Sequence, residues 1–379
     1  MATRTSSAPK SAPSTEPTPG RIWNFSAGPA ALPEPVLRQA QEDLWSIQGS
    51  GIGIAEHSHR GKIYEAVNAE AEANARELAG IPSNYKVLFL QGGASLQFAM
   101  VPYNLLPAGR VADYLVTGVW SQKAVKEAKA IGQVHSAYDG TATDFRAIPQ
   151  ASEISYSADP AYVHITTNNT IYGSQWRAEP PVPANAPLIA DTSSDMFSRP
   201  IDVSKYGLIY AGAQKNLGPS GVVLVIIRDD LLDRVPATVP TMLQYKTHAK
   251  EKSLFNTPNT FGVYLMGEVF KWIKAGGGLD AMARTNAEKA RLLYDAIDST
   301  DYWRGTADAG SRSFMNVCFR AANEELEKRF CDEATKAGLD GLKGHRATGG
   351  MRASIYNACP LGAVEALVAF MQEFERRNG

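Results

Sequence analysis

Short apolar runs, separated by longer amphipathic segments, dominate the middle of this 379-residue chain. Each run is nearly continuous in apolar residues and too short for a helix, which is typical of strands in a sheet covered on both faces. The runs that we expect to be strands are residues 86–90, 112–117, 162–166, 187–190, 208–210 and 222–227. Because helical segments alternate with these strands, the sequence predicts an α/β fold with a mostly parallel central sheet flanked by helices.

The helical pattern indicates two domains. Prolines mark helix starts and glycines mark helix ends. The expected helices are residues 33–48, 63–78, 96–105, 120–131, 264–275, 279–298, 324–337 and 364–375. Two further strands, 314–319 and 352–355, fall among the last helices. We therefore expect a large domain over residues 22–275 and a smaller C-terminal α/β domain over residues 276–379. In an alternative, the first residues of the large domain pack on the small one.

Composition excludes several classes of function. The 38 basic and 39 acidic residues give a formal net charge of −1, so bulk electrostatics do not favour a nucleic-acid partner. No apolar stretch approaches the roughly 20 residues that a membrane span needs. Cys318, Cys331 and Cys359 lack the spacing of a zinc site or a disulfide framework, which favours a cytoplasmic location. Residues 1–21 predict a disordered tail, and an organelle-targeting peptide is the less favoured alternative.

A candidate phosphate site follows the first expected strand. Ligands of a parallel α/β sheet sit beyond the carboxyl ends of its strands, and residues 91–95 (QGGAS) occupy that place before a helix. Small residues let the backbone approach an anion, and a helix N-terminus offers free N–H groups. Ala94 and Ser95 are therefore candidates for binding a phosphate, although the same segment would also serve as an ordinary turn.

Two charged residues follow other strands. Asp191 comes directly after residues 187–190, where a carboxylate is costly to bury unless it is paired. A helix N-cap or a salt bridge would also account for it. Lys215 lies in a run of small residues between two buried strands. A desolvated lysine loses its proton readily and becomes a nucleophile toward an aldehyde.

The phosphate site, the acid and the lysine together fit one cofactor, pyridoxal 5′-phosphate. This cofactor needs an anion site, an acid for its pyridine nitrogen and a lysine amine for its aldehyde. Trp120, which follows the strand ending at residue 117, is a candidate for stacking on the cofactor ring. As a single residue it is equally well explained as a core aromatic.

Several longer segments resemble the phosphoserine aminotransferases, which belong to the class-V pyridoxal-phosphate-dependent aminotransferases of fold type I. The resemblance runs from about residue 24 to the end of the chain, and its motifs occur in the right order. The matching segments are residues 24–29 (NFSAGP), 58–61 (SHRG), 189–195 (IADTSSD), 198–202 (SRPID), 210–216 (YAGAQKN), 255–258 (FNTP), 344–346 (GHR) and 349–354 (GGMRAS).

The resemblance implies a role for individual residues around the cofactor. Lys215 would carry one pyridoxal phosphate per subunit as a Schiff base, Asp191 would pair with the pyridine nitrogen, and Trp120 would stack on the ring. Thr170 would bond near the phenolic oxygen of the ring. The residues implied for the cofactor phosphate are Ala94, Ser95, Gln214 and, from the neighbouring subunit of a homodimer, Asn256 and Thr257. Some members of the family have Gly-Arg in place of Ala94 and Ser95, so neutral donors should bind the phosphate here.

The resemblance also implies the substrates. L-Glutamate would give its amino group to 3-phosphohydroxypyruvate, yielding O-phospho-L-serine and 2-oxoglutarate in serine biosynthesis. A related step of pyridoxine biosynthesis is a further option. Planar Arg352 suits a substrate carboxylate, which it can bind through two parallel hydrogen bonds. The residues implied for the distal anion of the substrate are His59, Arg60, His345 and Arg346. No metal site is expected.

Three other interpretations remain open from the sequence. A cysteine desulfurase would need a reactive cysteine on a mobile loop, and none of the three cysteines is placed that way. A sibling transaminase of the alanine–glyoxylate type would use the same cofactor with another acceptor. A nucleotide-binding module without catalysis is the third interpretation, because fold alone does not decide function. Such a protein would be colourless.

Overall fold

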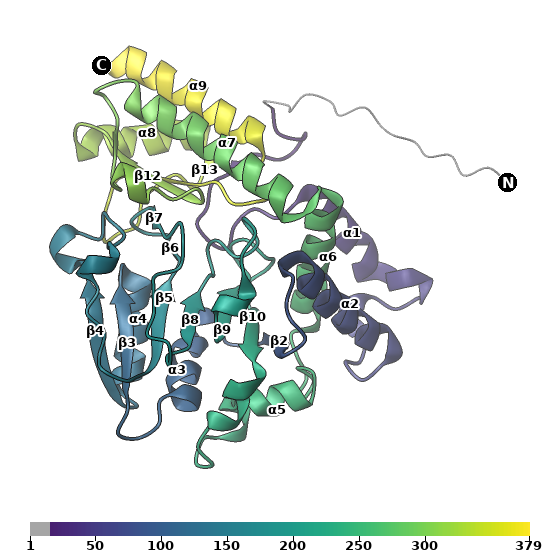
Figure 1. Cartoon of the computed structure of the whole chain (residues 1–379). Coiled ribbons are helices and arrows are strands. Elements are labelled where there is room, and N and C mark those ends of the chain that lie inside the picture. Colours follow the sequence, from purple (N-terminus) through teal and green to yellow (C-terminus); the bar gives the residue numbers. More distant parts are fainter. Residues whose placement is uncertain (1–15) are drawn as a thin grey trace.

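A seven-stranded sheet forms the centre of the computed structural model, which describes residues 16–379 (Figure 1). The order of its strands is β2-β10-β9-β8-β5-β3-β4. Only β10 is antiparallel to its neighbours, so the prediction of a mostly parallel sheet is confirmed. The strands are β2 (Tyr85–Leu90), β3 (Val111–Val116), β4 (Gln133–Asp139), β5 (Pro160–Thr166), β8 (Leu188–Asp191), β9 (Leu208–Gly212) and β10 (Val223–Arg228).

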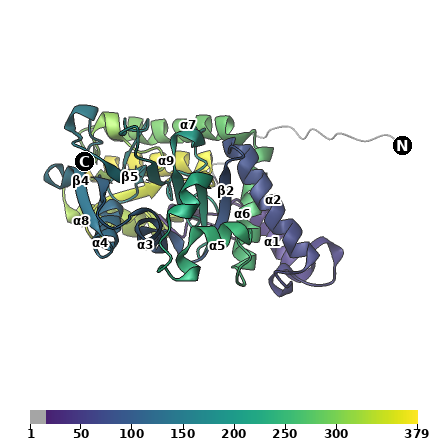
Figure 2. The same ribbon diagram turned by 60° about the horizontal axis from the view of Figure 1, so that its bottom comes forward.

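Helices cover both faces of this sheet, as its continuous apolar strands require. Successive side chains of β2 point to opposite faces: Val87 and Phe89 pack in one core, Leu88 and Leu90 in the other. The first core includes α1 (Glu34–Ser46), α2 (Lys62–Ala79) and α6 (Thr260–Ala275). The second includes α3 (Gly93–Leu105), α4 (Val119–Lys129) and α5 (Tyr245–Lys250), which lie along the lower edge of the molecule in Figure 2.

The C-terminal part has its own sheet and core. A three-stranded antiparallel sheet packs with three helices, and their buried side chains form one apolar cluster that also includes Phe25. Its elements are α7 (Gly278–Asp298), β11 (Arg304–Gly305), β12 (Asn316–Arg320), α8 (Glu324–Lys336), β14 (Met351–Ser354) and α9 (Leu361–Asn378). Near the start of the chain, β1 (Trp23–Asn24) pairs with β13 (Leu339–Asp340). The domain boundary at residue 275 stays a prediction.

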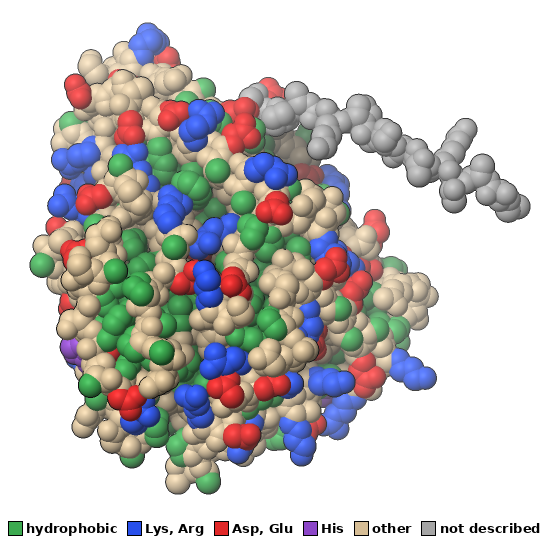
Figure 3. All heavy atoms as spheres, viewed as in Figure 1, with side chains coloured by type: hydrophobic (Ala, Val, Ile, Leu, Met, Phe, Trp, Pro, Cys, Tyr) green, Lys and Arg blue, Asp and Glu red, His purple; other side chains and the backbone are tan. Residues whose placement is uncertain are grey.

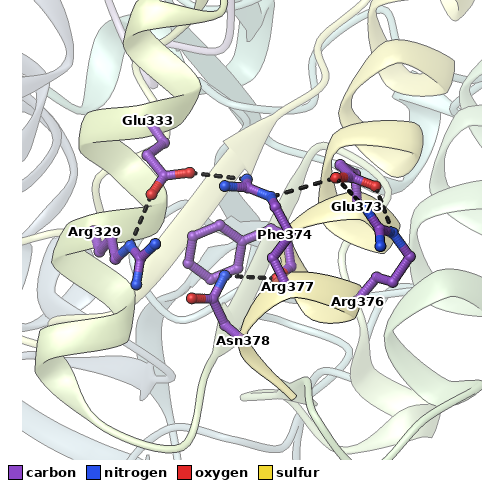
Figure 4. Close-up of polar contacts among 7 residues, drawn as sticks. All are labelled: Arg329, Glu333, Glu373, Phe374, Arg376, Arg377 and Asn378. Carbon is purple, nitrogen blue, oxygen red and sulfur yellow. Dashed lines mark hydrogen bonds and ion pairs between the residues drawn. The ribbon is translucent and has the colours of Figure 1, made fainter.

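The end of α9 is tied to α8 by charged side chains (Figure 4). Arg377 Nη2 lies 2.8 Å from Glu333 Oε2, and Arg329 Nε lies 2.7 Å from the other oxygen of Glu333. The guanidinium of Arg377 also lies 5.8 Å from the ring centre of Phe374, which is buried among aromatic rings of this core. Exposed ion pairs contribute little to the free energy of folding, so burial of the Phe374 ring stabilises this contact more than the charges do.

The structure differs from the sequence prediction at the start of one helix and in two elements that were not predicted. The helix expected to begin at residue 96 begins at Gly93, because Gly92 already adopts the left-handed conformation (φ 82°) that ends the turn. Ala94 and Ser95 therefore lie in the first turn of α3. Edge strand β4 and the short helix α5 were not predicted, since the side chains of β4 are largely exposed and its sequence has no continuous apolar run.

The surface and the first described residues add two observations. Acidic and basic side chains are interspersed over the face seen in Figure 3. No helix within residues 16–379 combines the length and apolar character needed to cross a membrane. The predicted N-terminal tail lies mostly in residues 1–15, outside the described residues. In the part that is described, Thr18 Oγ1 donates a hydrogen bond of 2.6 Å to Glu34.

Candidate active site

The candidate residues gather at one edge of the central sheet. Strands β2, β3, β5, β8 and β9 run in the same direction, so their carboxyl ends lie at the same edge. A parallel α/β sheet binds its ligands there. The segments that follow these five strands carry Ala94, Trp120, Thr170, Asp191 and Lys215.

The amine of Lys215 is held among three of the predicted residues. Its Nζ donates a hydrogen bond of 2.7 Å to Thr170 Oγ1 and lies 5.2 Å from the centre of the Trp120 ring. Burial lowers the pKa of Lys215 from its ordinary 10.5 to about 8, and the nearby Asp191 only partly offsets this effect. Near neutral pH an appreciable fraction of the amine is therefore uncharged, as a carbonyl nucleophile must be.

Gly28 leaves room for the Lys215 side chain. A Cβ atom on Gly28 would lie 3.2 Å from Lys215 Cγ, and the φ of Gly28 (143°) disfavours any other residue. The chain around Gly28 is held in place because Ala30 N donates to the Gln214 carbonyl at 2.9 Å. The N-terminal motif at residues 24–29 thus packs directly on the lysine.

Asp191 is a buried carboxylate that lacks a full set of partners. Its side chain is 4% exposed, and among the described residues its hydrogen bonds come from Ser193, whose N–H donates to Oδ1 at 2.9 Å. Burial raises the pKa of Asp191, which Ser193 and the charge of Lys215 counteract only in part. A protonated ring nitrogen placed against this carboxylate would supply the missing cationic donor. The residues present therefore fit the pyridine end of pyridoxal phosphate.

The first turn of α3 contains the residues of the predicted phosphate site. A Cβ atom on Gly212 would lie 2.8 Å from Gln214 Oε1 and 3.5 Å from Ala94 N, so β9, the Gln214 side chain and the start of α3 converge closely. Ser95 is exposed beside them. Neutral donors at a helix N-terminus fit a phosphate group, in keeping with the absence of an arginine at residues 94 and 95.

The ring of Trp120 is positioned by the start of α4. Ser121 Oγ accepts hydrogen bonds of 3.1 Å from the N–H groups of Thr117 and Gly118, which closes the turn after β3. A Cβ atom on Gly118 would lie 2.6 Å from Asn169 Oδ1, so a larger residue there would displace the buried Asn169 side chain. The indole Nε1 of Trp120 is buried without a hydrogen-bond partner.

A group of cations lies beside the lysine. Arg352 Nη1 approaches the Thr170 carbonyl at 3.4 Å, and the Arg352 Nε is buried without a partner. Burial lowers the pKa of His345, and the charges of Arg352, Arg346 and Lys123 lower it further. Like charges this close favour an anion between them. Arg352, Arg346 and Lys123 are thus all near enough to His345 to act on it electrostatically.

Lys123 was missed by the sequence analysis. Its Nζ lies 4.4 Å from the ring centre of Trp120, and its charge acts on His345. The signal was available, because residues three apart on a helix share a face and Trp120 was expected at a helix start. A lone exposed lysine on α4 gave no other reason to be chosen.

Two groups of predicted residues stand apart from this cluster. Among the described residues, no hydrogen bond, ion pair or ring contact joins His59 or Arg60 to Lys215, and both lie in the loop before α2. Their role at the substrate stays a prediction. Asn256 and Thr257 lie near the start of α3, where Gln91 Nε2 donates to the Thr257 carbonyl at 2.9 Å.

The comparisons with known proteins agree with this geometry. The family model "Aminotransferase class-V" matches residues 22–367. The chain therefore belongs to the class-V aminotransferases.

Within that class, the chain is most like one kind of enzyme. Phosphoserine aminotransferase from Herpetosiphon aurantiacus is 55% identical over 359 residues, which are 94% of this chain and 99% of the relative. The solved structure of phosphoserine aminotransferase from Bacillus circulans subsp. alkalophilus is 52% identical over 95% of this chain and 99% of its own, with a TM-score of 0.93. That of the pyridoxal-phosphate-bound enzyme from Trichomonas vaginalis is 40% identical over 93% of this chain and 100% of its own, with a TM-score of 0.86.

The cysteines do not suit the chemistry of a desulfurase. All three are free, and Cys318 and Cys359 are buried. Burial raises the pKa of Cys318 to about 12 and that of Cys331 and Cys359 to about 11. A nucleophilic cysteine needs the opposite shift, so this alternative is not favoured.

The lowered pKa of Lys215 makes a prediction for the cofactor-free protein. The second-order rate of pyridoxal phosphate uptake, followed by absorbance, should rise with pH as the amine loses its proton and level off above a midpoint near pH 8. Lys289 also has a pKa of about 8, but all its protons are donated in the core, so Lys215→Ala should abolish the uptake although Lys289 is still present. A midpoint near the ordinary 10.5 would contradict the burial argument.

Proposed function

We propose that this protein is a transaminase that moves the amino group of L-glutamate to 3-phosphohydroxypyruvate, with pyridoxal phosphate bound to Lys215. The observation that carries the proposal is the placement of the Lys215 amine on Thr170, beside Trp120 and close to the buried Asp191. The phosphoserine aminotransferases that are more than half identical to the chain over nearly their full length support the choice of substrates.

Each residue has a distinct task in this proposal. When bound, the cofactor supplies an electron-withdrawing ring that stabilises negative charge on the substrate carbon. Asp191 keeps a proton on the ring nitrogen, and Trp120 covers one face of the ring. Lys215 Nζ, in its uncharged form, would take a proton from the substrate carbon as a base and then, as an acid, deliver it to the cofactor carbon that retains the nitrogen. Arg352 orients the substrate carboxylate through its planar guanidinium.

The cation cluster explains the preference for a doubly anionic substrate. A phosphorylated keto acid carries a carboxylate and a phosphate, so a single arginine cannot neutralise it. Arg346, His345 and Lys123 lie close enough to Arg352 to supply the second anion site. An anion between them would stabilise the protonated form of His345, opposing the lowering of its pKa by its neighbours.

Production of phosphoserine tests the proposal. The purified protein, mixed with L-glutamate and 3-phosphohydroxypyruvate, should yield O-phospho-L-serine and 2-oxoglutarate in equal amounts, measured by mass spectrometry. Lys215→Ala should abolish turnover and the visible absorption band of the bound cofactor, because no other amine can replace it. Amino transfer to glyoxylate without transfer to the phosphorylated acceptor would move the assignment to another transaminase.

We also propose a cytoplasmic homodimer. Trp45 is 86% exposed, and Leu44, Ile52 and Phe255 are also large apolar side chains open to solvent. A second subunit covering these residues would remove them from water. It would also explain why His59 and Arg60 lie apart from Lys215 of their own subunit, since they would then complete the site of the partner. Three unpaired cysteines support the reducing compartment.

Mixed dimers test this sharing of residues. Arg60→Ala and Lys215→Ala chains, each of low activity alone, are co-expressed with different affinity tags. If Arg60 acts on the partner site, each mixed dimer has one intact site, and random pairing should restore about a quarter of wild-type activity. If Arg60 acts within its own subunit, the mixture should show no more activity than its parents, and the shared site would be disproved.

A further inference from the structure

The segment that follows Arg352 is anchored by a fully buried lysine. Residues 355–359 connect β14 to α9, and Lys289 of α7 donates its three Nζ protons to their carbonyl groups. The distances are 3.0 Å to Ile355, 2.7 Å to Tyr356 and 2.9 Å to Cys359. A buried ammonium is tolerated only when all its donors are used, so the match of three protons to three carbonyls fixes this segment against α7.

Asn357 lies at the centre of the anchored segment and bonds in three directions. Its backbone N–H donates to Asn216 Oδ1 at 2.9 Å, and its side-chain Nδ2 donates to the Phe197 carbonyl at 2.9 Å. Its Oδ1 accepts a hydrogen bond of 2.8 Å from Asn286 of α7. Asn357 is 5% exposed, so water cannot replace these bonds without a local opening of the fold.

The partners of Asn357 belong to the segments that carry the candidate catalytic groups. Asn216 is the residue after Lys215, and it also donates to the Met196 carbonyl at 3.1 Å. Phe197 belongs to the turn that begins directly after Asp191. Arg352 lies on β14, just before the segment of Asn357. One buried residue thus joins three segments: its backbone N–H binds the chain beside Lys215, its side chain binds the turn after Asp191, and its own segment follows Arg352.

The turn after Asp191 needs such support. Phe197 has a φ of 60°, in the left-handed region that a bulky side chain disfavours. This conformation is unfavourable by itself and persists only where the surroundings enforce it. The Phe197 ring packs on Phe270 with ring centres 5.2 Å apart, and two asparagines fix the backbone: Asn357 bonds the Phe197 carbonyl, and Asn286 bonds the Ser198 carbonyl at 3.0 Å.

We propose that Asn357 is a positioning residue for the reaction: it holds the segments of Lys215, Asp191 and Arg352 in one mutual arrangement. The inference rests on the proposed transaminase function, because it assigns the three groups to one reaction. Asn357 itself contacts neither substrate nor cofactor residues. Loss of the Asn357 side chain should lower the reaction rate strongly, because a displacement of about 1 Å in a reacting group costs up to roughly a hundredfold in rate.

The test compares two buried asparagines in the full-length, cofactor-loaded protein. Asn104→Ala is the matched control: Asn104 is 2% exposed and makes three hydrogen bonds with backbone groups of Met100, Leu243 and Tyr245, away from the site. Both variants should lower the melting temperature. Only Asn357→Ala should reduce kcat by about tenfold or more, raise the KM for glutamate and shift the pH midpoint of the visible absorption band.

A third readout is independent of turnover. The cofactor-free Asn357→Ala protein should take up pyridoxal phosphate with a pH midpoint different from that of wild type, because the turn after Asp191, whose charge acts on the Lys215 amine, loses its bond from the Asn357 side chain. The Asn104→Ala protein should keep the wild-type midpoint.

The outcomes separate the two claims. A wild-type protein that makes no phosphoserine contradicts the proposed function. If wild type is active and Asn357→Ala matches Asn104→Ala in kcat, KM and both pH midpoints, Asn357 is only structural and the inference is wrong. If Asn357→Ala does not fold, Asn286→Ala replaces it, since that change removes the bonds to Asn357 and Ser198 while leaving Asn357 in place. It should shift kcat and the midpoints in the same direction by a smaller amount, and wild-type values would overturn the inference.

Discussion

The burial of an acid and an amine at one edge of the central sheet is the constraint on which the rest of the structure depends. Asp191 is nearly inaccessible to solvent, and burial raises the pKa of Asp191 and lowers that of Lys215, because it disfavours the charged form of both groups. Placing them there costs free energy unless partners compensate. The compensation comes from Ser193, from Thr170 and, in the proposed function, from the cationic ring nitrogen of the cofactor. A parallel sheet can bring these partners together because the carboxyl ends of five of its strands lie at the same edge.

Much of the fold was readable from the sequence because its strands are apolar on both faces. The runs around Leu88, Ile189 and Tyr210 have the length and apolar character of buried strands, and Asp191 and Lys215 were chosen as candidates because they follow the last two of these runs. The helix start at Gly93 and edge strand β4 were not predictable in the same way. The first depends on the left-handed backbone of Gly92, and the second on hydrogen bonds to β3 that leave no pattern in the exposed side chains of β4.

The site was predicted less completely, for a physical reason. Lys215, Asp191 and Trp120 follow strands, so their meeting place could be deduced from the topology. Asn357 and Lys123 act through neighbours that the fold brings together from distant parts of the chain or across one helix turn, and no local pattern distinguishes a buried asparagine from an exposed one. His59 and Arg60 were chosen from the resemblance alone, and their role at the substrate depends on the proposed second subunit.

The account depends most directly on Lys215 as the single attachment point of the cofactor. Borohydride reduction of the pyridoxal-phosphate-loaded protein makes that attachment permanent, and peptide mass spectrometry then locates it. The account predicts a phosphopyridoxyl group on the peptide that contains Lys215 and on no other lysine, the buried Lys289 included. A label on a different lysine, or none at all in a protein that still transfers amino groups, would contradict it.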